Sequence, residues 1–576
     1  MTIIGIDLGT TNSAMAVYKD GKAVIVVNSL DQRTTPSAFQ LKPSGEEVIG
    51  ASAKKGASSL PKHTALEVKR EMGKEDKIQV GEKSYRPEEI SSKILRYLKK
   101  SAEEKLGESV DEAVITVPAY FTDAQRKATQ IAGELAGFQV ERIINEPTAA
   151  ALAFCHENLN EDKYILVYDL GGGTFDVSLV ELFDGIIEVK STMGDNFLGG
   201  TDFDEAILQL AKGKFEKEMG YPMETIANDS DMLYRMLKEA AESAKIELST
   251  QVETEVSVPF IGLKDNMPIS FSTRLTRIEF EAAIRVKVES TIDKVHAALE
   301  EANIPADKVS DILMVGGSSR VPLVRELVEK AFGSKLRTDI NPDEVVAVGA
   351  AVQAGLKSGQ IDSSVGLVAI DVCPYTLGIE VVSYVQSNMV PGYFDPIITK
   401  NTVIPATKTK TYNTVTDGQT YINIKIFQGE GRFTSENILV SDELHVENIP
   451  PNKAGAEQID VTFTYDINGN IQVEALVLST GQKVKQVIQS QTGVMSAAEK
   501  NAAMERMEKE GLDTDLYAGM KKAIHNAEKM MDSCSPEDQV RIQDILGKIE
   551  KAVAAEDNSA LKKLDENLLD LLIELV

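Results

Sequence analysis

The sequence has few of the residues that build disulfide frameworks, zinc sites or aromatic surfaces. Its 576 residues include three cysteines, five histidines and no tryptophan. Cys155, Cys373 and Cys534 lie far apart and form no Cys-x-x-Cys pair, which excludes a disulfide scaffold and indicates a reducing compartment. The histidines show no helical pair or ligand spacing, so no zinc site is expected.

Long apolar runs and basic character are also missing. No apolar stretch approaches about 18 residues, so no membrane span is expected. The first residues enter an apolar strand without a basic leader, and we therefore expect a cytoplasmic protein. The formal net charge of −28 repels phosphate backbones and anionic lipid, which argues against nucleic acid and membranes as partners. The length predicts several domains.

The first 362 residues alternate apolar strands with longer helical segments, which predicts an α/β domain. Strands are predicted at Thr2–Asp7, Glu112–Val117, Tyr164–Asp169 and Asp311–Val315, and helices at Ala124–Gly137, Pro147–His156, Met232–Leu248 and Phe280–Asn303. A strand that ends in Asp-Leu-Gly occurs twice, at Asp7 and at Asp169, and a Gly/Thr turn and a second strand follow each time. This repeat, with a spacing of 169 − 7 = 162 residues, predicts a duplicated domain with a cleft between its halves.

The remaining sequence predicts two further parts. Turn signals separate short alternating segments, which is typical of a β-sandwich. These segments are Lys408–Thr414, Tyr421–Phe427, Gln458–Tyr465 and Ile471–Val477. From Met495 onward the pattern is helical, with a capping box that begins at Ser535. The last helix has an apolar stripe formed by Leu561, Leu564, Leu568, Leu572 and Leu575.

The two Asp-Leu-Gly turns have the chemistry of a phosphate site. Their glycines let backbone N–H groups approach an anion because no Cβ intervenes, and their threonines add hydroxyl donors. Their aspartates supply the hard oxygens that a hydrated Mg²⁺ prefers. The residues are Gly9, Gly171, Gly172 and Gly173, then Thr10, Thr11 and Thr174, then Asp7, Asp169 and Asp176. A single such turn would be an ordinary hairpin, but two matched turns predict a site for ATP and Mg²⁺.

A third glycine-rich turn, Met314–Arg320, follows another apolar strand. Gly316 and Gly317 would admit a flat nucleoside against the backbone, and Arg320 could then lie over the base. The alternative interpretation is a plain strand-to-helix turn.

Five motifs point to one family: Gly5–Ser13, Val117–Phe121, Ile144–Ala151, Asp169–Asp176 and Asn341–Glu344. Over nearly the whole chain, the sequence resembles the heat-shock protein 70 chaperones of the bacterial DnaK type. The resemblance implies an actin-like ATPase domain at 1–362, a linker at 363–371, a peptide-binding β-sandwich at 372–494 and a helical lid at 495–576. It implies a chaperone that binds extended apolar segments of unfolded proteins and switches its affinity for them by hydrolysing ATP.

The resemblance also assigns a nucleotide site. It implies that Lys69 lies beside the γ-phosphate and Glu146 near the attacking water, with Asp7, Asp169 and Thr174 beside them. From the residues alone, Lys69 would be a surface charge and Glu146 a helix start. The implied nucleotide-binding set is Gly9, Thr10, Thr11, Asn12, Gly171, Gly172, Gly173, Glu242, Lys245, Ser249, Gly316, Gly317, Ser318, Arg320 and Asp343. The implied cofactors are ATP or ADP, Mg²⁺ at Asp7, Asp169 and Asp176, and K⁺.

Two further sets follow from the resemblance. The peptide-binding set is Ile379, Val382, Tyr412, Val415, Ile422 and Ile424, with Ile426 beside it and with Val382 and Val415 as an arch at loop positions. The relay between nucleotide and linker is Pro118, Arg126, Leu367 and Ile370. Ile424 and Ile426 could instead be core residues, and Pro118 a strand terminator. The implied partners are unfolded polypeptides, a J-domain co-chaperone and a GrpE-type exchange factor.

The sequence departs from the family pattern in four places. The linker at Gly366–Asp371 is less leucine-rich than usual, and Ser387–Asp395 looks like an insertion in the first loops of the sandwich. The turn Gln428–Arg432 lacks the arginine that commonly follows its glutamate. The helical segment is shorter than in most relatives, so we expect a short-lid paralogue with faster peptide release in the ADP state.

Two other protein classes share the duplicated fold. Sugar and acetate kinases use it for phosphoryl transfer, but this function would leave the residues after 362 unexplained. Actin-like filaments also use it, but a sandwich and a helical unit on every subunit would obstruct assembly. We therefore predict the chaperone.

Overall fold

The computed structural model describes residues 2–156, 162–183, 185–333, 335–337, 340–362, 367–385, 388–488, 495–496, 498–504, 506, 527, 536–554, 563–564, 567–568 and 571. Contacts within the chain divide it into two compact units, Met1–Pro43 with Val48–Val494, and Ser44–Glu47 with Met495–Val576. Among the described helices, none combines the length and apolar character that a membrane crossing requires.

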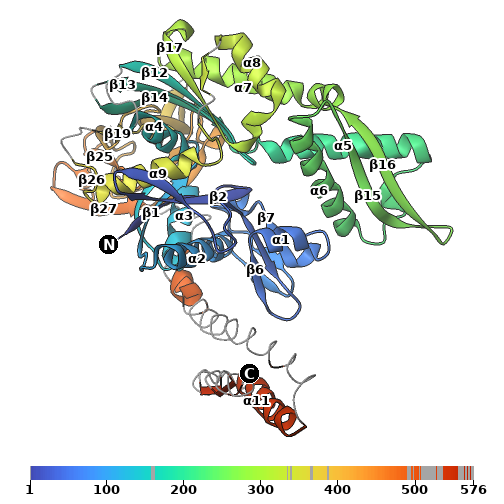
Figure 1. Cartoon of the computed structure of the whole chain (residues 1–576). Helices are drawn as coiled ribbons and strands as arrows, with labels where there is room; N and C mark the ends of the chain where they lie inside the picture. The colour runs from blue at the N-terminus through green and yellow to red at the C-terminus, as the bar shows by residue number, and fades with distance from the viewer. Residues whose placement is uncertain are drawn as a thin grey trace. The chain divides into compact units, whose positions relative to one another are not determined.

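The first half of the α/β part is built on one six-stranded mixed sheet, in the order β11-β10-β1-β2-β3, and β4 pairs with β2 beside this path. Figure 1 labels β1 and β2 of this sheet. Its strands are β1 (Ile3–Asp7), β2 (Asn12–Lys19), β3 (Lys22–Val26), β4 (Thr34–Pro36), β10 (Glu112–Val117) and β11 (Gln139–Asn145). β1 is parallel to β10 and antiparallel to β2, and Asp7 lies opposite Ala14 in that hairpin.

The second half repeats this arrangement in the order β18-β17-β12-β13-β14-β19. Its strands are β12 (Lys163–Leu170), β13 (Phe175–Phe183), β14 (Ile186–Asp195), β17 (Val309–Val315), β18 (Leu336–Arg337) and β19 (Val368–Ile370). β12 is parallel to β17 and antiparallel to β13, and Asp169 lies opposite Asp176. Equivalent strands therefore have the same neighbours and the same register, which confirms the predicted duplication.

Two helices join the halves. α4 (Glu146–His156) and α9 (Val345–Lys357) pack against each other, and α9 also lies against β1 and β2 (Figure 1). The helices approach closely because a Cβ at Gly349 would lie 1.7 Å from the carbonyl oxygen of Ala149. One buried core runs through this region and takes side chains from both sheets, including Val114 and Val167.

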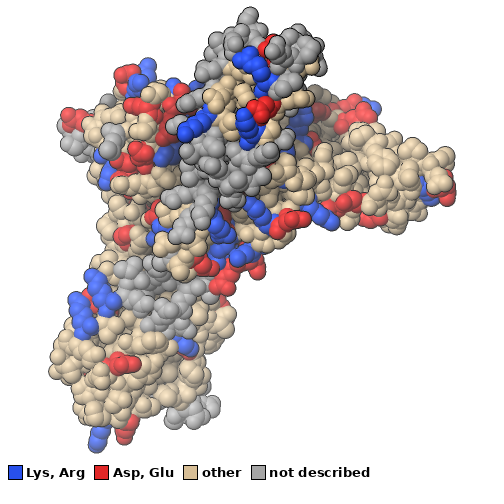
Figure 2. Space-filling model, turned by 90° about the horizontal axis from the view of Figure 1, so that it is seen from below, with Lys and Arg blue, Asp and Glu red and all other residues tan. Residues whose placement is uncertain are grey.

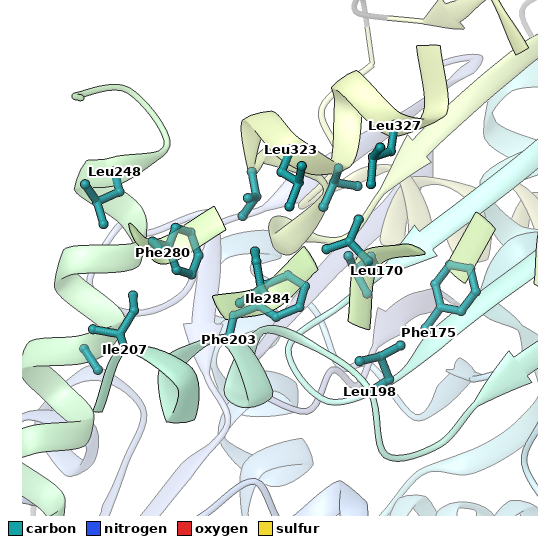
Figure 3. Close-up of a cluster of buried hydrophobic side chains, with 14 of the residues drawn as sticks. Leu170, Phe175, Leu198, Phe203, Ile207, Leu248, Phe280, Ile284, Leu323 and Leu327 are labelled. Atoms are coloured by element: carbon teal, nitrogen blue, oxygen red, sulfur yellow. The ribbon is translucent and has the colours of Figure 1, made fainter. Parts of the chain in front are cut away.

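Further helices cover the outer faces of the two halves. In the first half these are α2 (Pro87–Leu106) and α3 (Asp123–Leu135), with the short α1 (Ala51–Gly56). In the second half they are α5 (Gly200–Met219), α6 (Ser230–Leu248), α7 (Arg277–Glu301) and α8 (Pro322–Phe332), with the hairpin β15 (Glu253–Lys264) and β16 (Met267–Thr276). Phe203, Phe280 and Ile284 lie at the centre of the core that holds the second set together (Figure 3). The predicted helices thus exist, with small differences at their ends.

Residues 377–488 form two four-stranded antiparallel sheets that enclose one core, which confirms the predicted sandwich. One sheet contains β20 (Leu377–Val385), β21 (Asn388–Ile398), β23 (Ile422–Gln428) and β24 (Ile438–Val446). The other contains β22 (Ala406–Asn413), β25 (Gln458–Tyr465), β26 (Ile471–Val477) and β27 (Gln482–Ile488). Phe463 and Val473 are fully buried between the sheets.

The prediction that Ser387–Asp395 lies in a loop is wrong for residues 388–395, which belong to β21; Ser387 is outside the described residues. β21 is an edge strand, where Pro391 and Pro396, which lack an N–H, are tolerated. The prediction that Val382 lies in a loop is also wrong. It lies within β20 at a register shift, whereas Val415 does lie in the loop after β22.

In the second unit, α11 (Pro536–Ala554) buries Ile542 and Ile549. Leu568 is also buried, and Leu564 is half-buried. Ser535 of the predicted capping box and Leu561, Leu572 and Leu575 of the predicted stripe lie outside the described residues.

Figure 2 shows basic side chains interspersed with acidic ones on one face of the molecule, so the excess of acidic residues does not form a single patch there.

Candidate functional site

Most of the predicted nucleotide-site residues line one cavity of about 380 Å³ between the two halves. They are Asp7, Gly9, Thr10, Thr11, Asn12, Lys69, Glu146, Asp169, Gly171, Gly172, Thr174, Glu242, Lys245, Gly316, Gly317, Ser318, Arg320 and Asp343. Gly173, Asp176 and Ser249 lie outside this lining. The cavity thus brings together the ends of β1 and β12 and the turn after β17.

The two predicted phosphate loops contact each other at the cavity. A Cβ at Gly172 would lie 1.9 Å from Oγ1 of Thr11, and one at Gly173 would lie 2.6 Å from Cγ2 of Thr10. Glycine is therefore required for the loops to approach. The buried Oγ1 of Thr11 has no hydrogen-bond partner within the described part of the chain, so it is available to a phosphate oxygen.

Lys69 and Glu146 form a buried ion pair at the edge of the cavity. Lys69 lies in the short helix Val68–Glu71, and its Nζ is 2.5 Å from Oε1 of Glu146. Their side chains are 7% and 8% exposed, and Nζ also lies 5.7 Å from the ring centroid of Phe121. Because so little water reaches the pair, each charge is stabilised mainly by the other.

Three buried carboxyls lie behind the phosphate loops. Burial, strengthened by the charge of Glu146, raises the pKa of Asp7 to about 7 and of Asp176 to about 8, and it raises the pKa of Asp169 well above its usual value. Asp176 accepts a hydrogen bond from the Tyr120 amide at 3.2 Å, and its Oδ2 has no partner among the described residues.

These carboxyls fit a hydrated cation. In the described part of the chain, no three His, Cys, Asp or Glu residues are grouped closely enough to hold a metal ion directly. Mg²⁺ usually keeps several waters and takes phosphate oxygens as ligands. Such an ion would favour the ionised forms of Asp7, Asp169 and Asp176, and the carboxylates could accept hydrogen bonds from its waters.

The predicted adenosine side is held by contacts between distant segments. Gly316 has φ +78°, and a Cβ there would lie 2.4 Å from the carbonyl oxygen of Leu170. Ser318 Oγ donates to the Gly171 carbonyl at 2.8 Å, and Arg320 Nη2 lies 2.6 Å from Asp343 Oδ2. The Ser249 hydroxyl donates to the Lys245 carbonyl at the end of α6.

Arg70 is a site residue that sequence analysis missed. Its Nη2 donates to the Gly173 carbonyl at 2.9 Å and to Asp202 Oδ2 at 2.7 Å, which ties the segment of Lys69 to the second phosphate loop. A second missed contact joins Lys54 Nζ and Glu242 Oε1 at 2.8 Å across the opening of the cleft. Their partners are more than 100 positions away in the sequence, and no local pattern indicates such a pair.

A second cavity, of about 680 Å³, lies in the sandwich. All six predicted peptide-binding residues line it: Ile379, Val382, Tyr412, Val415, Ile422 and Ile424. The register shift in β20 brings both Val381 and Val382 to the lining. Ile426 does not line the cavity and is fully buried in the core.

The predicted relay residues lie in two segments, the loop after β10 with the start of α3, and the linker at β19. The buried Arg126 donates to the carbonyls of Ala119 and Phe121 at 2.9 and 3.2 Å, which fixes the loop that begins at Pro118. Leu367 is buried, and Ile370 is half-buried in β19.

A comparison with protein-family models gives one match, Hsp70 protein, over residues 3–573. Members of this family are ATP-dependent chaperones that bind ATP or ADP with Mg²⁺, hydrolyse ATP and act on unfolded polypeptides. The match extends through the sandwich and into the helical segment, which neither the kinase nor the filament alternative explains. The cavities and the family model therefore agree, and the chain belongs to the Hsp70 family.

Proposed function

We propose that this chain is a DnaK-type chaperone in which residues 1–362 hydrolyse ATP and residues 372–494 bind peptide. Residues 363–371 act as the linker that changes peptide affinity, and residues 495–576 act as the lid. The proposal rests on contacts that join the α/β part to the sandwich; residues 363–366 of the linker are outside the described range.

These contacts begin at a carboxyl of the nucleotide site. The Tyr120 amide donates to Asp176, and the Tyr120 carbonyl accepts a hydrogen bond of 2.8 Å from the hydroxyl of Tyr375, two residues before β20 begins. The two tyrosine rings lie 4.6 Å apart. A change at Asp176 on nucleotide binding would therefore reach the sandwich through one loop.

The linker gives a second connection. β19 pairs in parallel with Ile186–Glu188 of β14, and Leu367 is 5% exposed within the core shared by the two halves. On the sandwich side, Lys400 Nζ lies 3.0 Å from Glu301 Oε1 at the end of α7. Such contacts support a docked state that the nucleotide would favour and that hydrolysis would release.

The chemistry proposed for the nucleotide site is positioning and charge neutralisation. Transfer of a phosphoryl group to water needs these more than a strong base. Lys69 would stabilise charge on the γ-phosphate, Glu146 would hold Lys69 and orient the attacking water, and Thr174 would donate to a phosphate oxygen. K⁺ would assist Mg²⁺, and an unchanged rate when Na⁺ replaces K⁺ would contradict this part.

The sandwich cavity suits an extended apolar peptide. Isoleucines and valines line it, and burial of a leucine or isoleucine side chain there contributes about 1.5–3 kcal/mol. We propose a J-domain protein that stimulates hydrolysis, a GrpE-type factor that removes ADP, and a cytoplasmic location.

Peptide binding tests the proposal. Fluorescence anisotropy with a leucine-rich peptide should show tight binding with ADP and weaker, faster-exchanging binding with ATP. Ile422→Asp should abolish binding because it puts a charge in the cavity. Ile438→Asp is the matched control, because Ile438 is 53% exposed on β24 and does not line the cavity. Affinity that neither falls with Ile422→Asp nor changes with ATP would leave only an ATPase.

A further inference from the structure

Tyr412 lines the sandwich cavity and is hydrogen-bonded to a carboxylate that is not part of the lining. The Tyr412 hydroxyl donates to Asp395 Oδ2 at 2.7 Å, and Lys410 Nζ lies 2.7 Å from the same carboxylate. Tyr412 belongs to β22 and Asp395 to β21, so this bond joins the two sheets of the sandwich at the cavity. Asp395 is 24% exposed, which leaves the bond only partly open to competing water.

The backbone around Asp395 holds the carboxylate in place. On one side, β21 lies so close to β20 that a Cβ at Gly378 would be 2.1 Å from the carbonyl oxygen of Asp395. On the other side, the Phe394 amide donates to the Arg432 carbonyl at 3.1 Å. The rings of Tyr393 and Phe433 also pack at 5.1 Å. Asp395 is therefore preorganised to accept the Tyr412 hydroxyl.

The Tyr412 ring has two alternatives when this bond is broken. Burial and the neighbouring Asp395 carboxylate raise the pKa of the Tyr412 hydroxyl, so it remains a donor throughout the neutral range. A hydroxyl without a partner next to apolar side chains is unfavourable. The ring would either keep an unsatisfied hydroxyl in the wall or turn toward water and leave the wall open.

We propose that Asp395 is a positioning residue that sets the side-chain preference of the client cavity by holding the Tyr412 ring as a fixed wall. The inference rests on the proposed function. With the ring fixed in the lining that it shares with Ile379 and Ile422, the cavity accepts branched aliphatic side chains and rejects larger aromatic ones. With the ring released, the cavity widens and admits a client phenylalanine. Asp395 lies in the segment that departs from the family pattern, so this preference would be specific to this chain.

The test compares two peptides that differ only in a central leucine or phenylalanine. Anisotropy on the full-length protein with ADP gives the ratio of their affinities. Asp395→Ala leaves the Tyr412 hydroxyl without its partner and should shift the ratio about tenfold toward phenylalanine, which is the order of one charge-assisted hydrogen bond. Tyr412→Phe has no hydroxyl to satisfy, so its ring should stay in the wall and the ratio should shift less. The double variant should match Tyr412→Phe. Asp395→Asn retains an acceptor oxygen and should preserve the leucine preference.

A matched control lies on β22 outside the cavity lining. The hydroxyls of Thr409 and Thr462 lie 2.8 Å apart between β22 and β25, and neither residue lines the cavity. Thr462→Ala should leave the ratio unchanged. An Asp395→Ala variant that weakens both peptides equally would assign Asp395 a purely structural role and overturn the inference. Wild-type protein that binds neither peptide would overturn the proposed function as well. An Asp395→Ala variant that binds peptide normally, with the same leucine-to-phenylalanine affinity ratio as the wild type, would overturn the inference alone.

Discussion

Nζ of Lys69 and Oε1 of Glu146 lie 2.5 Å apart, and both side chains are almost inaccessible to water. Lys69 comes from a short helix far from Glu146 in the sequence, yet both side chains line the nucleotide cavity. Removal of one partner from such a buried pair costs about 3–5 kcal/mol because the other charge is left uncompensated. A variant at either position therefore changes stability as well as chemistry, and the two effects must be separated.

Lys69→Ala should retain ATP binding but lose most of the single-turnover rate, because the charge beside the γ-phosphate is gone. The melting temperature of the nucleotide-free variant should also fall. The double variant Lys69→Met/Glu146→Gln removes both charges and should recover much of the melting temperature without recovering turnover. A double variant that regains activity would show that the pair is only structural.

The sequence predicted the duplicated sheets because each copy carries its own local pattern. It predicted less of the site, because the site depends on contacts between the copies. The position equivalent to Asp176 in the first copy is Ala14, so Asp176 was assigned from its own turn and not from the symmetry of the repeat. Arg70 was missed because an arginine beside Lys69 looks like another surface charge. The six predicted peptide-binding residues do line one cavity, but the hydroxyl–carboxylate bond between β21 and β22 was not predicted because residues 388–395 were interpreted as a loop.

The affinity for Mg²⁺ and ADP should weaken as the pH falls from 9 to 6. Without nucleotide, Asp7 and Asp176, which lie near the charges of Glu146 and Lys69, have pKa values of about 7 and 8. Both carboxyls therefore take up protons as the pH falls from 9 to 6. A bound cation favours the ionised carboxylates, and the protons must then leave. Each proton released lowers the apparent affinity up to about tenfold per pH unit. Calorimetry in buffers of different ionisation enthalpy should detect proton release that grows below pH 8.

The same pKa values fix the sign of the stability change without nucleotide. The carboxyls bind protons more tightly in the folded chain than in the unfolded chain, where the pKa is 3.8. Their contribution to the free energy of unfolding is therefore largest near pH 4 and is lost as the pH rises through 7 and 8. If the binding of Mg²⁺ and ADP releases no protons at pH 6.5, the expected pH dependence of the affinity and that of the stability are both contradicted.

Arg70→Ala should lower the single-turnover rate about tenfold while affecting ADP affinity less. Arg70 touches the Gly173 carbonyl and Asp202 but does not line the cavity, so it acts by positioning the second phosphate loop. Loss of its hydrogen bonds, each contributing about 1.5–3 kcal/mol at a charged group, would let that loop drift from the γ-phosphate. Arg70→Lys should recover part of the rate. Lys74→Ala removes an exposed ion pair with Glu71 nearby and should have no effect.

Coupling between the cavities should depend on the buried side of β19. Leu367, which directly precedes β19, is 5% exposed, whereas Val368, the first residue of that strand, is 51% exposed. Leu367→Asp with Ile370→Asp should leave ATP binding intact and abolish the stimulation of ATP turnover by peptide. Undocking exposes the new carboxylates to water, so the substitutions disfavour the docked state more than the fold itself.

Val368→Asp is the matched control, since it adds a charge to β19 at a position that is already exposed, and it should keep the stimulation by peptide. Steady-state turnover with and without peptide measures both outcomes. Stimulation that survives in the double variant would mean that coupling does not need the linker. Tyr375→Phe then separates the two connections, because it removes only the hydrogen bond to the Tyr120 carbonyl. Loss of stimulation in Tyr375→Phe alone would assign the coupling to the path from Asp176 through Tyr120.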